Sequence, residues 1–209
     1  MIDAMANGMA QKLGYIVSAE DKVEIYAYAF KLVIMLLLNL AIVIMAAYLL
    51  GIVPTVLAFM TVFFPFRAFG GGVHLSALPR CIIVGSLIIL GSGYFAAQTD
   101  ISQMAVIILF LFTFLIICLG IVKWAPAGTK TNPITDSQII RMQKRNLLFA
   151  AIIWTCIVPA LIQGLHLSLA LAMVTGAMAA VLLMSPGGFL LMEKVDGFFT
   201  ILRKGGPGL

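Results

Sequence analysis

Acidic residues are scarce in this sequence and unevenly placed. Only 10% of the 209 residues are charged, and no Asp or Glu occurs between Glu24 and Asp100. Ion-coupled carriers usually keep ionisable groups inside the membrane, so this scarcity argues against a pump or a proton-coupled carrier. The sequence also has no Walker motif, no HExxH and no CxxC pair, the usual signatures of nucleotide binding, zinc peptidases and thiol redox exchange.

Cysteine is rare as well. The chain has three cysteines, and an odd number without a soluble extracytoplasmic domain argues against a disulfide framework. Cys118 and Cys156 lie inside apolar runs, where a cysteine is expected to act as a small buried hydrophobe. Cys81 has a different setting, after a loop and at the start of an apolar run.

Apolar residues are abundant. They make up 63% of the chain, and the mean hydropathy is +1.14, whereas a soluble domain is roughly half apolar and a quarter charged. The apolar runs stand at about 30–50, 52–66, 81–97, 103–122, 147–163 and 167–192. Each is near the ~17–25 residues that cross a bilayer, except the short run 52–66. Such runs form helices, because backbone groups in lipid must be satisfied internally, and they lack the alternation of barrel strands.

We therefore predict an all-α membrane protein with six transmembrane helices in a single domain over residues 1–209. The N-terminal residues mix acids and bases and do not predict a cleavable signal peptide. The net charge of +5 does not indicate nucleic-acid binding, because the basic residues follow a topological pattern. They gather before the first run, between runs two and three, between runs four and five, and after run six. The connections near residues 51, 98–102 and 164–166 contain no Lys or Arg, so the positive-inside rule predicts that both termini are cytoplasmic.

Two segments outside the predicted spans have patterns of their own. Residues 1–17 place apolar side chains at helical spacing among polar ones, which indicates either an amphipathic helix on the membrane surface or a frayed terminus. The cytoplasmic loop 123–146 contains the possible helix starts Asn132-Pro133 and Thr135-x-x-Gln138. Behind them, Arg141, Lys144 and Arg145 form a basic cluster, which is suited to anionic lipid or to an acidic substrate segment.

The segment 67–81, between the second and third runs, has the composition of a catalytic loop. Gly70, Gly71 and Gly72 permit a tight non-helical turn, and unsatisfied amides there would suit a developing negative charge. His74 and Cys81 are seven positions apart, which along a helix means ~10.5 Å of rise. Pro79 favours a helix start near itself, so His74 is left in the loop and is able to fold back on Cys81.

A thiol in the first turn of a helix is well placed for nucleophilic chemistry. The helix dipole and free amides stabilise a thiolate, and Arg67 and Arg80 add positive charge. His74 is then the candidate base that takes the thiol proton and later protonates a leaving amine. No third or fourth ligand stands near this pair, so we expect neither a metal nor another cofactor.

The pattern Arg67-x-x-Gly-Gly-Gly-x-His74, followed by six residues and Cys81 within six hydrophobic spans, resembles the accessory gene regulator B family. These are membrane cysteine endopeptidases of Gram-positive bacteria that process quorum-sensing propeptides. The resemblance implies a multi-pass cell-membrane enzyme with its active site at the cytoplasmic face, Cys81 as the nucleophile and His74 as its general base. It also implies that Arg67 and Gly72 are needed for activity.

The implied substrate is a propeptide with an amphipathic leader and an acidic C-terminal tail. Cleavage would leave the signal segment on Cys81 as a thioester, and an internal Cys or Ser would then close a thiolactone or lactone ring. Supporting, oxyanion or substrate-binding roles are expected of Arg67, Gly70, Gly71, Gly72, Ser76 and Arg80. Candidates for binding the acidic tail are Lys130, Arg141, Lys144 and Arg145.

Some alternatives stay open from the sequence. No Asp or Glu near the motif is available to orient His74, which leaves a backbone carbonyl, Ser76 or Asn132 for that role. The chain could also be a peptide transporter or export channel with the glycines as a hinge, or a non-catalytic scaffold with a basic face. Besides the lipid bilayer, a second copy of the chain, as a homodimer, is a possible partner.

Overall fold

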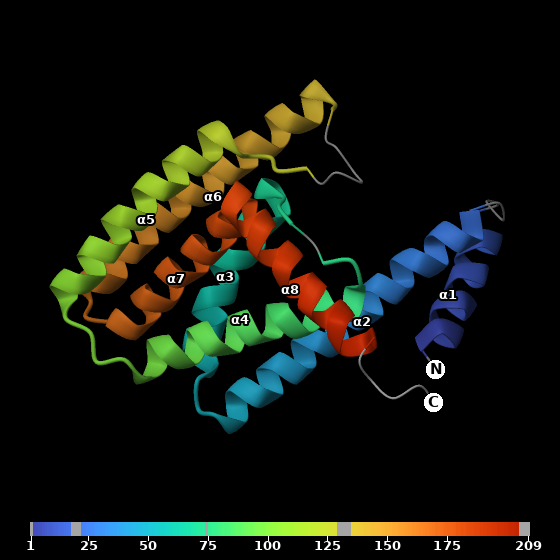
Figure 1. Ribbon diagram of the computed structural model, residues 1–209, viewed down its shortest axis with the longest axis horizontal. Helices are drawn as coiled ribbons and strands as arrows, with labels where there is room; N and C mark the ends of the chain where they lie inside the picture. Colours follow the sequence, from blue (N-terminus) through green and yellow to red (C-terminus); the bar gives the residue numbers. More distant parts are fainter. Residues whose placement is uncertain (1, 18–21, 74, 129–134, 205–209) are drawn as a thin grey trace. The chain divides into compact units, whose positions relative to one another are not determined.

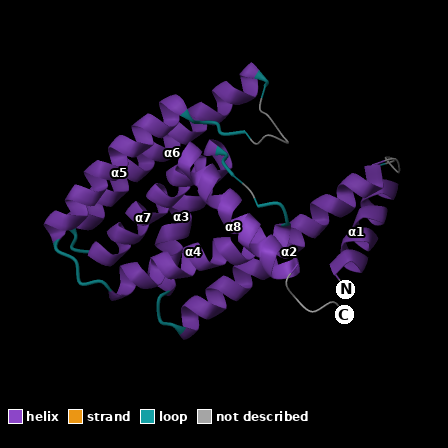
Figure 2. Ribbon diagram, viewed as in Figure 1, coloured by secondary structure: helices purple, strands orange, loops and turns teal. Residues whose placement is uncertain are grey.

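The computed structural model describes residues 2–17, 22–73, 75–128 and 135–204. Figure 1 shows the path of the chain, and Figure 2 shows that helices make up nearly all of the described part. Within these ranges no strand forms, and one isolated bridge pairs Gly71 with Ala127. The helices are α1 (Ile2–Ile16), α2 (Val23–Leu49), α3 (Val53–Gly70), α4 (Leu78–Gln98), α5 (Gln103–Lys123), α6 (Ser137–Gln163), α7 (Leu167–Met184) and α8 (Pro186–Lys204).

Six helices in the described part of the chain are long and apolar enough to cross a membrane, which confirms the predicted number of spans. They are α2, α3, α4 from Pro79 onwards, α5, α6 and α7. The short second run becomes a full span because α3 continues to Gly70, beyond the apolar residues that marked it in the sequence. The cytoplasmic position of both termini stays a prediction.

The prediction for the sixth run was wrong in its extent. The run 167–192 is interrupted, because α7 ends at Met184 and α8 begins at Pro186. Ser185 separates them: its hydroxyl donates to the Leu182 carbonyl (2.7 Å) and accepts from the Gly188 N–H (3.1 Å). A proline at the first position of a helix needs no N–H partner, so this sequence starts a new helix instead of continuing the span.

The prediction for the loop 123–146 also changes. Helix α6 begins at Ser137, and the Asp136 side chain caps it by accepting from the Gln138 N–H at 2.7 Å. The predicted cap at Thr135 was therefore wrong by one residue; a carboxylate accepts strongly and complements the helix dipole. Asn132 and Pro133 lie outside the described residues. The basic cluster thus belongs to the first turns of α6, where its members are Arg141, Lys144 and Arg145.

The chain divides into two compact units, Met1–Ala46 and Ala47–Leu209. In the first unit, residues 2–16 form the predicted helix α1, and Asp3 pairs with Lys31 of α2 at 2.6 Å. The hydrogen bond from Lys31 holds the pKa of Asp3 below its ordinary value. The position of α1 on a membrane surface stays a prediction.

In the second unit, α7 is the central helix and packs against α3, α4, α5, α6 and α8 (Figure 1). Close approach depends on small residues, as is usual for helices in membranes. A Cβ added at Gly176 would lie only 2.7 Å from the Phe59 carbonyl oxygen of α3. The indole N–H of Trp154 in α6 donates to the Met173 carbonyl at 3.2 Å. This packing holds the ends of α3 and α7 together, where the glycine-rich turn begins.

Cys118 and Cys156 are free thiols with exposed side chains, which corrects the expectation that they are buried. They lie in the spanning helices α5 and α6, so an outward-facing thiol there faces lipid instead of the packed core. A weakly polar side chain is tolerated in that setting.

Candidate active site

The turn between α3 and α4 departs from helical geometry at two glycines. Helix α3 ends at Gly70, and Gly71 adopts φ 71° and ψ −144°, followed by Gly72 at φ 118°. Residues with a side chain rarely adopt such backbone angles. The two glycines therefore turn the chain sharply away from the axis of α3.

Backbone hydrogen bonds hold this turn against two other segments. The Gly72 N–H donates to the Ala127 carbonyl (2.9 Å), and the Ala127 N–H donates to the Gly70 carbonyl (2.8 Å). The Val73 N–H donates to the Leu183 carbonyl at the end of α7 (3.2 Å). Because the turn is bonded to the segment after α5 and to α7, its position depends on elements more than fifty residues away in the sequence.

These bonds also occupy amides that the sequence suggested as oxyanion donors. The Gly71 N–H donates to the Arg67 carbonyl at 3.1 Å, and the Gly72 N–H is taken by Ala127. Amides that already have good acceptors are not free for a developing oxyanion, so we do not assign Gly71 and Gly72 that role. Gly70 is the last residue of α3. The Met184 side chain fills the space beside it, so that an added Cβ would collide with the Met184 sulfur.

Arg67 clamps the same turn from the last turn of α3. Its Nη1 donates to the Gly71 carbonyl (2.7 Å), and its Nη2 donates to the Val73 carbonyl (2.9 Å). A Cβ at Gly72 would collide with Arg67 Nη1 and lie 2.7 Å from the Leu183 carbonyl oxygen. The fork geometry of a guanidinium suits two carbonyls at once. Arg67 and Gly72 thus form one structural unit, in which the glycine makes room for the arginine.

Cys81 lies in the first turn of α4, which begins at Leu78 with Pro79 in that turn, as predicted. Its N–H donates to the Ala77 carbonyl (3.2 Å). The half-buried Sγ atom accepts a hydrogen bond from the Leu75 N–H at 3.0 Å and lies 3.8 Å from the Leu75 carbonyl oxygen. The loop before α4 therefore folds back onto the thiol.

His74 lies outside the described residues, as do Lys130 and Asn132. The residues on either side of His74 are both anchored, because Val73 is bonded to Leu183 and Arg67, and Leu75 is bonded to Cys81. The Cys–His pair therefore stays a prediction, although the chain next to His74 reaches Cys81. Among the described residues, no three His, Cys, Asp or Glu side chains gather as metal ligands would.

Arg80 and Ser76 come together with an aspartate that the sequence did not suggest. Arg80 Nη1 donates to Asp196 Oδ1 of α8 at 2.8 Å and lies 3.3 Å from Ser76 Oγ. The hydrogen bonds from Arg80 and then from Ser76 lower the pKa of Asp196. An acid thus reaches the motif from 116 residues away. No local pattern in the sequence signals this contact.

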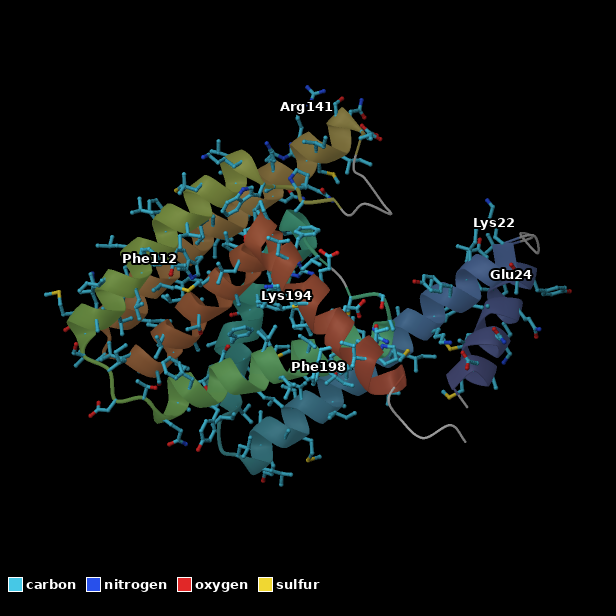
Figure 3. All side chains as sticks on the ribbon, viewed as in Figure 1. Lys22, Glu24, Phe112, Arg141, Lys194 and Phe198 are labelled. Carbon is cyan, nitrogen blue, oxygen red and sulfur yellow. The ribbon has the colours of Figure 1, made fainter. Side chains whose placement is uncertain are left out.

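The predicted basic cluster lies elsewhere in this unit. Arg141 and Arg145 are exposed and Lys144 is half-buried, and Figure 3 shows Arg141 near the start of α6. Within the described part of the chain, none of the three is hydrogen-bonded or ion-paired to the turn or to α4; Arg141 donates to the Ser137 carbonyl at 3.3 Å. A largely apolar cavity of about 530 Å³ lies between α3 and α6, and its lining includes Phe66 and Phe69 but not Cys81.

Fold and site together define a class of protein. It is a polytopic helical membrane protein with a thiol at the start of a spanning helix, hydrogen-bonded by the loop that follows a glycine turn. The model of the family named accessory gene regulator B matches residues 2–185, which is most of the chain, and the chain belongs to that family. Membership implies a role in processing quorum-sensing propeptides and an enzyme of peptidase type. No curated protein and no solved structure matches the chain.

Proposed function

We propose that this protein is a membrane cysteine endopeptidase with Cys81 as its nucleophile and His74 as its general base. It cleaves the C-terminal tail from a quorum-sensing propeptide at the cytoplasmic face of the cell membrane of a Gram-positive bacterium. The acyl-enzyme thioester that forms on Cys81 then permits closure of a thiolactone or lactone ring. Family membership supports the substrate class, and the geometry around Cys81 supports the chemistry.

The observation that carries the proposal is the 3.0 Å hydrogen bond from the Leu75 N–H to Cys81 Sγ. Cys118 and Cys156 are the other thiols, and both lie in the interior of spanning helices with exposed side chains. A cysteine becomes nucleophilic where donors and positive ends of dipoles stabilise its thiolate. Cys81 has the loop donor and lies in the first turn of α4.

The reaction proceeds in two steps of acyl transfer. His74 accepts the thiol proton, and the thiolate attacks the carbonyl carbon of the scissile peptide to give a tetrahedral intermediate. Collapse breaks the C–N bond, His74 returns the proton to the leaving amine, and the acyl group stays on Sγ. An internal thiol or hydroxyl of the bound peptide then attacks the thioester, releasing Cys81 as the ring closes. Exchange between thioesters is close to isoenergetic, so removal of the tail or of the product drives ring closure.

Binding of an acidic tail requires cations that are not already engaged. Arg80 is paired with Asp196, whereas Arg141, Lys144 and Arg145 have no ion-pair partner among the described residues. Opposite charges on a membrane-surface segment and a peptide tail attract at the range of the Debye length. We therefore assign the tail to the start of α6, together with Lys130.

The test uses the full chain in liposomes with its propeptide. A Cys81→Ala variant is expected to lose cleavage and the hydroxylamine-sensitive thioester adduct, whereas a Cys118→Ala/Cys156→Ala double variant is expected to keep both. A His74→Ala variant should lose cleavage by roughly a hundredfold or more. Cleavage by the Cys81 variant at the wild-type rate, or its loss in the double variant, would refute the assignment.

A further inference from the structure

The guanidinium of Arg80 ties helix α8 to the start of the helix that carries Cys81. Its Nη1 lies within 3.3 Å of four oxygen atoms: Asp196 Oδ1 (2.8 Å), Thr200 Oγ1 (3.1 Å), the Asp196 carbonyl (3.3 Å) and Ser76 Oγ (3.3 Å). The Arg80 guanidinium also stands over the Phe199 ring at 5.8 Å. The Arg80 and Asp196 side chains are only 16% and 23% exposed. A charge pair that is largely shielded and shared with hydroxyls is more rigid than an isolated surface pair.

The two sides of α8 differ in a way that explains how the helix stays in place. Asp196, Phe199 and Thr200, which surround Arg80, share one side at helical spacing. The large exposed apolar residues of α8 lie on the opposite side by the same geometry, and they are Leu190, Leu191, Phe198 and Ile201. Figure 3 labels Phe198 and Lys194 along this helix. In a membrane protein an outward apolar stripe is stable in lipid, which leaves the polar side to hold Arg80.

Two members of this cluster, Arg80 and Ser76, are sequence neighbours of the residues that form the hydrogen bond to the Cys81 sulfur. Arg80 immediately precedes Cys81, and Ser76 immediately follows Leu75, whose N–H donates to Sγ. Arg80 Nη1 donates to both Asp196 Oδ1 and Ser76 Oγ, so the pairing of Arg80 with Asp196 restrains the two chain segments that meet at the sulfur. Displacement of a reacting group by about 1 Å costs up to a hundredfold in rate.

We propose that Asp196 is a positioning residue of the active site: through Arg80 and Ser76, it holds the loop amide of Leu75 on the Cys81 sulfur. This inference rests on the proposed peptidase function for its kinetic consequence. It assigns α8 a role in catalysis, although α8 lies wholly beyond residues 2–185, the part of the chain that the family model matches.

The experiment uses the full chain with Cys118 and Cys156 replaced by Ala, in phosphatidylcholine–phosphatidylglycerol vesicles, so that Cys81 is the only thiol. Asp196→Asn is compared with Glu193→Gln, a matched change of an exposed acid one turn earlier in α8. We expect Asp196→Asn to lower kcat for propeptide cleavage about 10-fold with KM within about twofold. Asp196→Glu should recover part of the loss, and Glu193→Gln should match the parent protein.

A double-variant cycle and a substrate-free measurement complete the test. If Asp196 acts through its partner, Arg80→Gln/Asp196→Asn should be no worse than the poorer single variant, whereas multiplied losses would overturn the proposal. Equal kcat in Asp196→Asn and Glu193→Gln would overturn it as well, and so would a rise in kcat, which would mean that Asp196 blocks Arg80.

Alkylation of Cys81 by iodoacetamide without substrate separates this proposal from the peptidase assignment. Asp196→Asn is expected to slow alkylation at pH 7 about threefold relative to Glu193→Gln, because the loop donor is no longer held on the sulfur. If the parent protein cleaves no propeptide but this difference appears, the peptidase function fails and the positioning role of Asp196 stands. If cleavage occurs and alkylation is equal in the two variants, the positioning role fails alone.

Discussion

Replacing Gly72 with Ala tests the arginine clamp directly. Gly72 has φ 118°, and a non-glycine residue in such a conformation costs about 1–3 kcal/mol. The new Cβ would collide with Arg67 Nη1 and lie 2.7 Å from the Leu183 carbonyl oxygen, which is backbone and cannot simply rotate away. Arg67 must then release at least one of its two carbonyl bonds, each worth about 1.5–3 kcal/mol because the donor is charged.

The two costs together amount to about 2.5–6 kcal/mol against the native turn. Since 1.36 kcal/mol corresponds to a factor of ten, the equilibrium constant that favours the native turn, with the Leu75 amide on Cys81, falls by roughly a hundredfold. The spanning helices do not depend on this turn for their own hydrogen bonds, so the loss is expected in activity far more than in thermal stability. Propeptide cleavage in liposomes measures the first, and a thermal melt followed by helical circular dichroism measures the second.

Gly85→Ala is the matched control, because Gly85 lies in the same helix as Cys81 and an added Cβ meets nothing within 4 Å. An alanine there is a better helix former by up to about 1 kcal/mol, so cleavage should stay within about twofold of the parent. Cleavage by the Gly72 variant within threefold of the parent would refute the clamp, and so would an equal loss in the Gly85 variant.

Two further predictions concern the charged groups around the turn. Arg67→Lys keeps the charge but replaces a guanidinium that binds two carbonyls with a single ammonium, so we expect cleavage to fall about tenfold or more. Added guanidinium at millimolar concentration should not restore cleavage to Arg67→Lys but should restore part of it to Arg67→Ala. Cleavage by Arg67→Lys equal to the parent would show that charge alone suffices. Arg80 holds the pKa of Asp196 below its ordinary value of 3.8, so the carboxylate contributes fully above that value and its contribution is lost only as pH falls through the lowered pKa. The ratio of cleavage rates between Asp196→Asn and the parent should therefore be constant from about pH 5 to 8. A drift of that ratio would mean that another group titrates together with the Arg80–Asp196 pair.

Much of this architecture follows from the sequence alone because its causes are local. Six apolar runs, all but the run 52–66 near membrane-crossing length, predict six spans, since unbonded backbone is too costly in lipid for other structures. Pro79 predicts the start of α4 because proline restricts its own φ and the residue before it. The first turn of α4 thus places Cys81 at a helix start. The errors were also local: Asp136 instead of Thr135 caps α6, and Pro186 begins α8 within an apolar run.

The tertiary structure decided which groups surround the thiol. Three glycines predict a tight turn, but only packing shows that Ala127 and Leu183 take the amides of Gly72 and Val73, so that these amides are not free for catalysis. No acidic residue lies near Arg80 in the sequence, yet α8 brings Asp196 into contact with it from 116 residues away. Helix periodicity and proline chemistry act within a few residues, whereas a hydrogen bond between distant segments depends on how the helices pack, and that is why the sequence determined where Cys81 lies and the fold determined what holds it there.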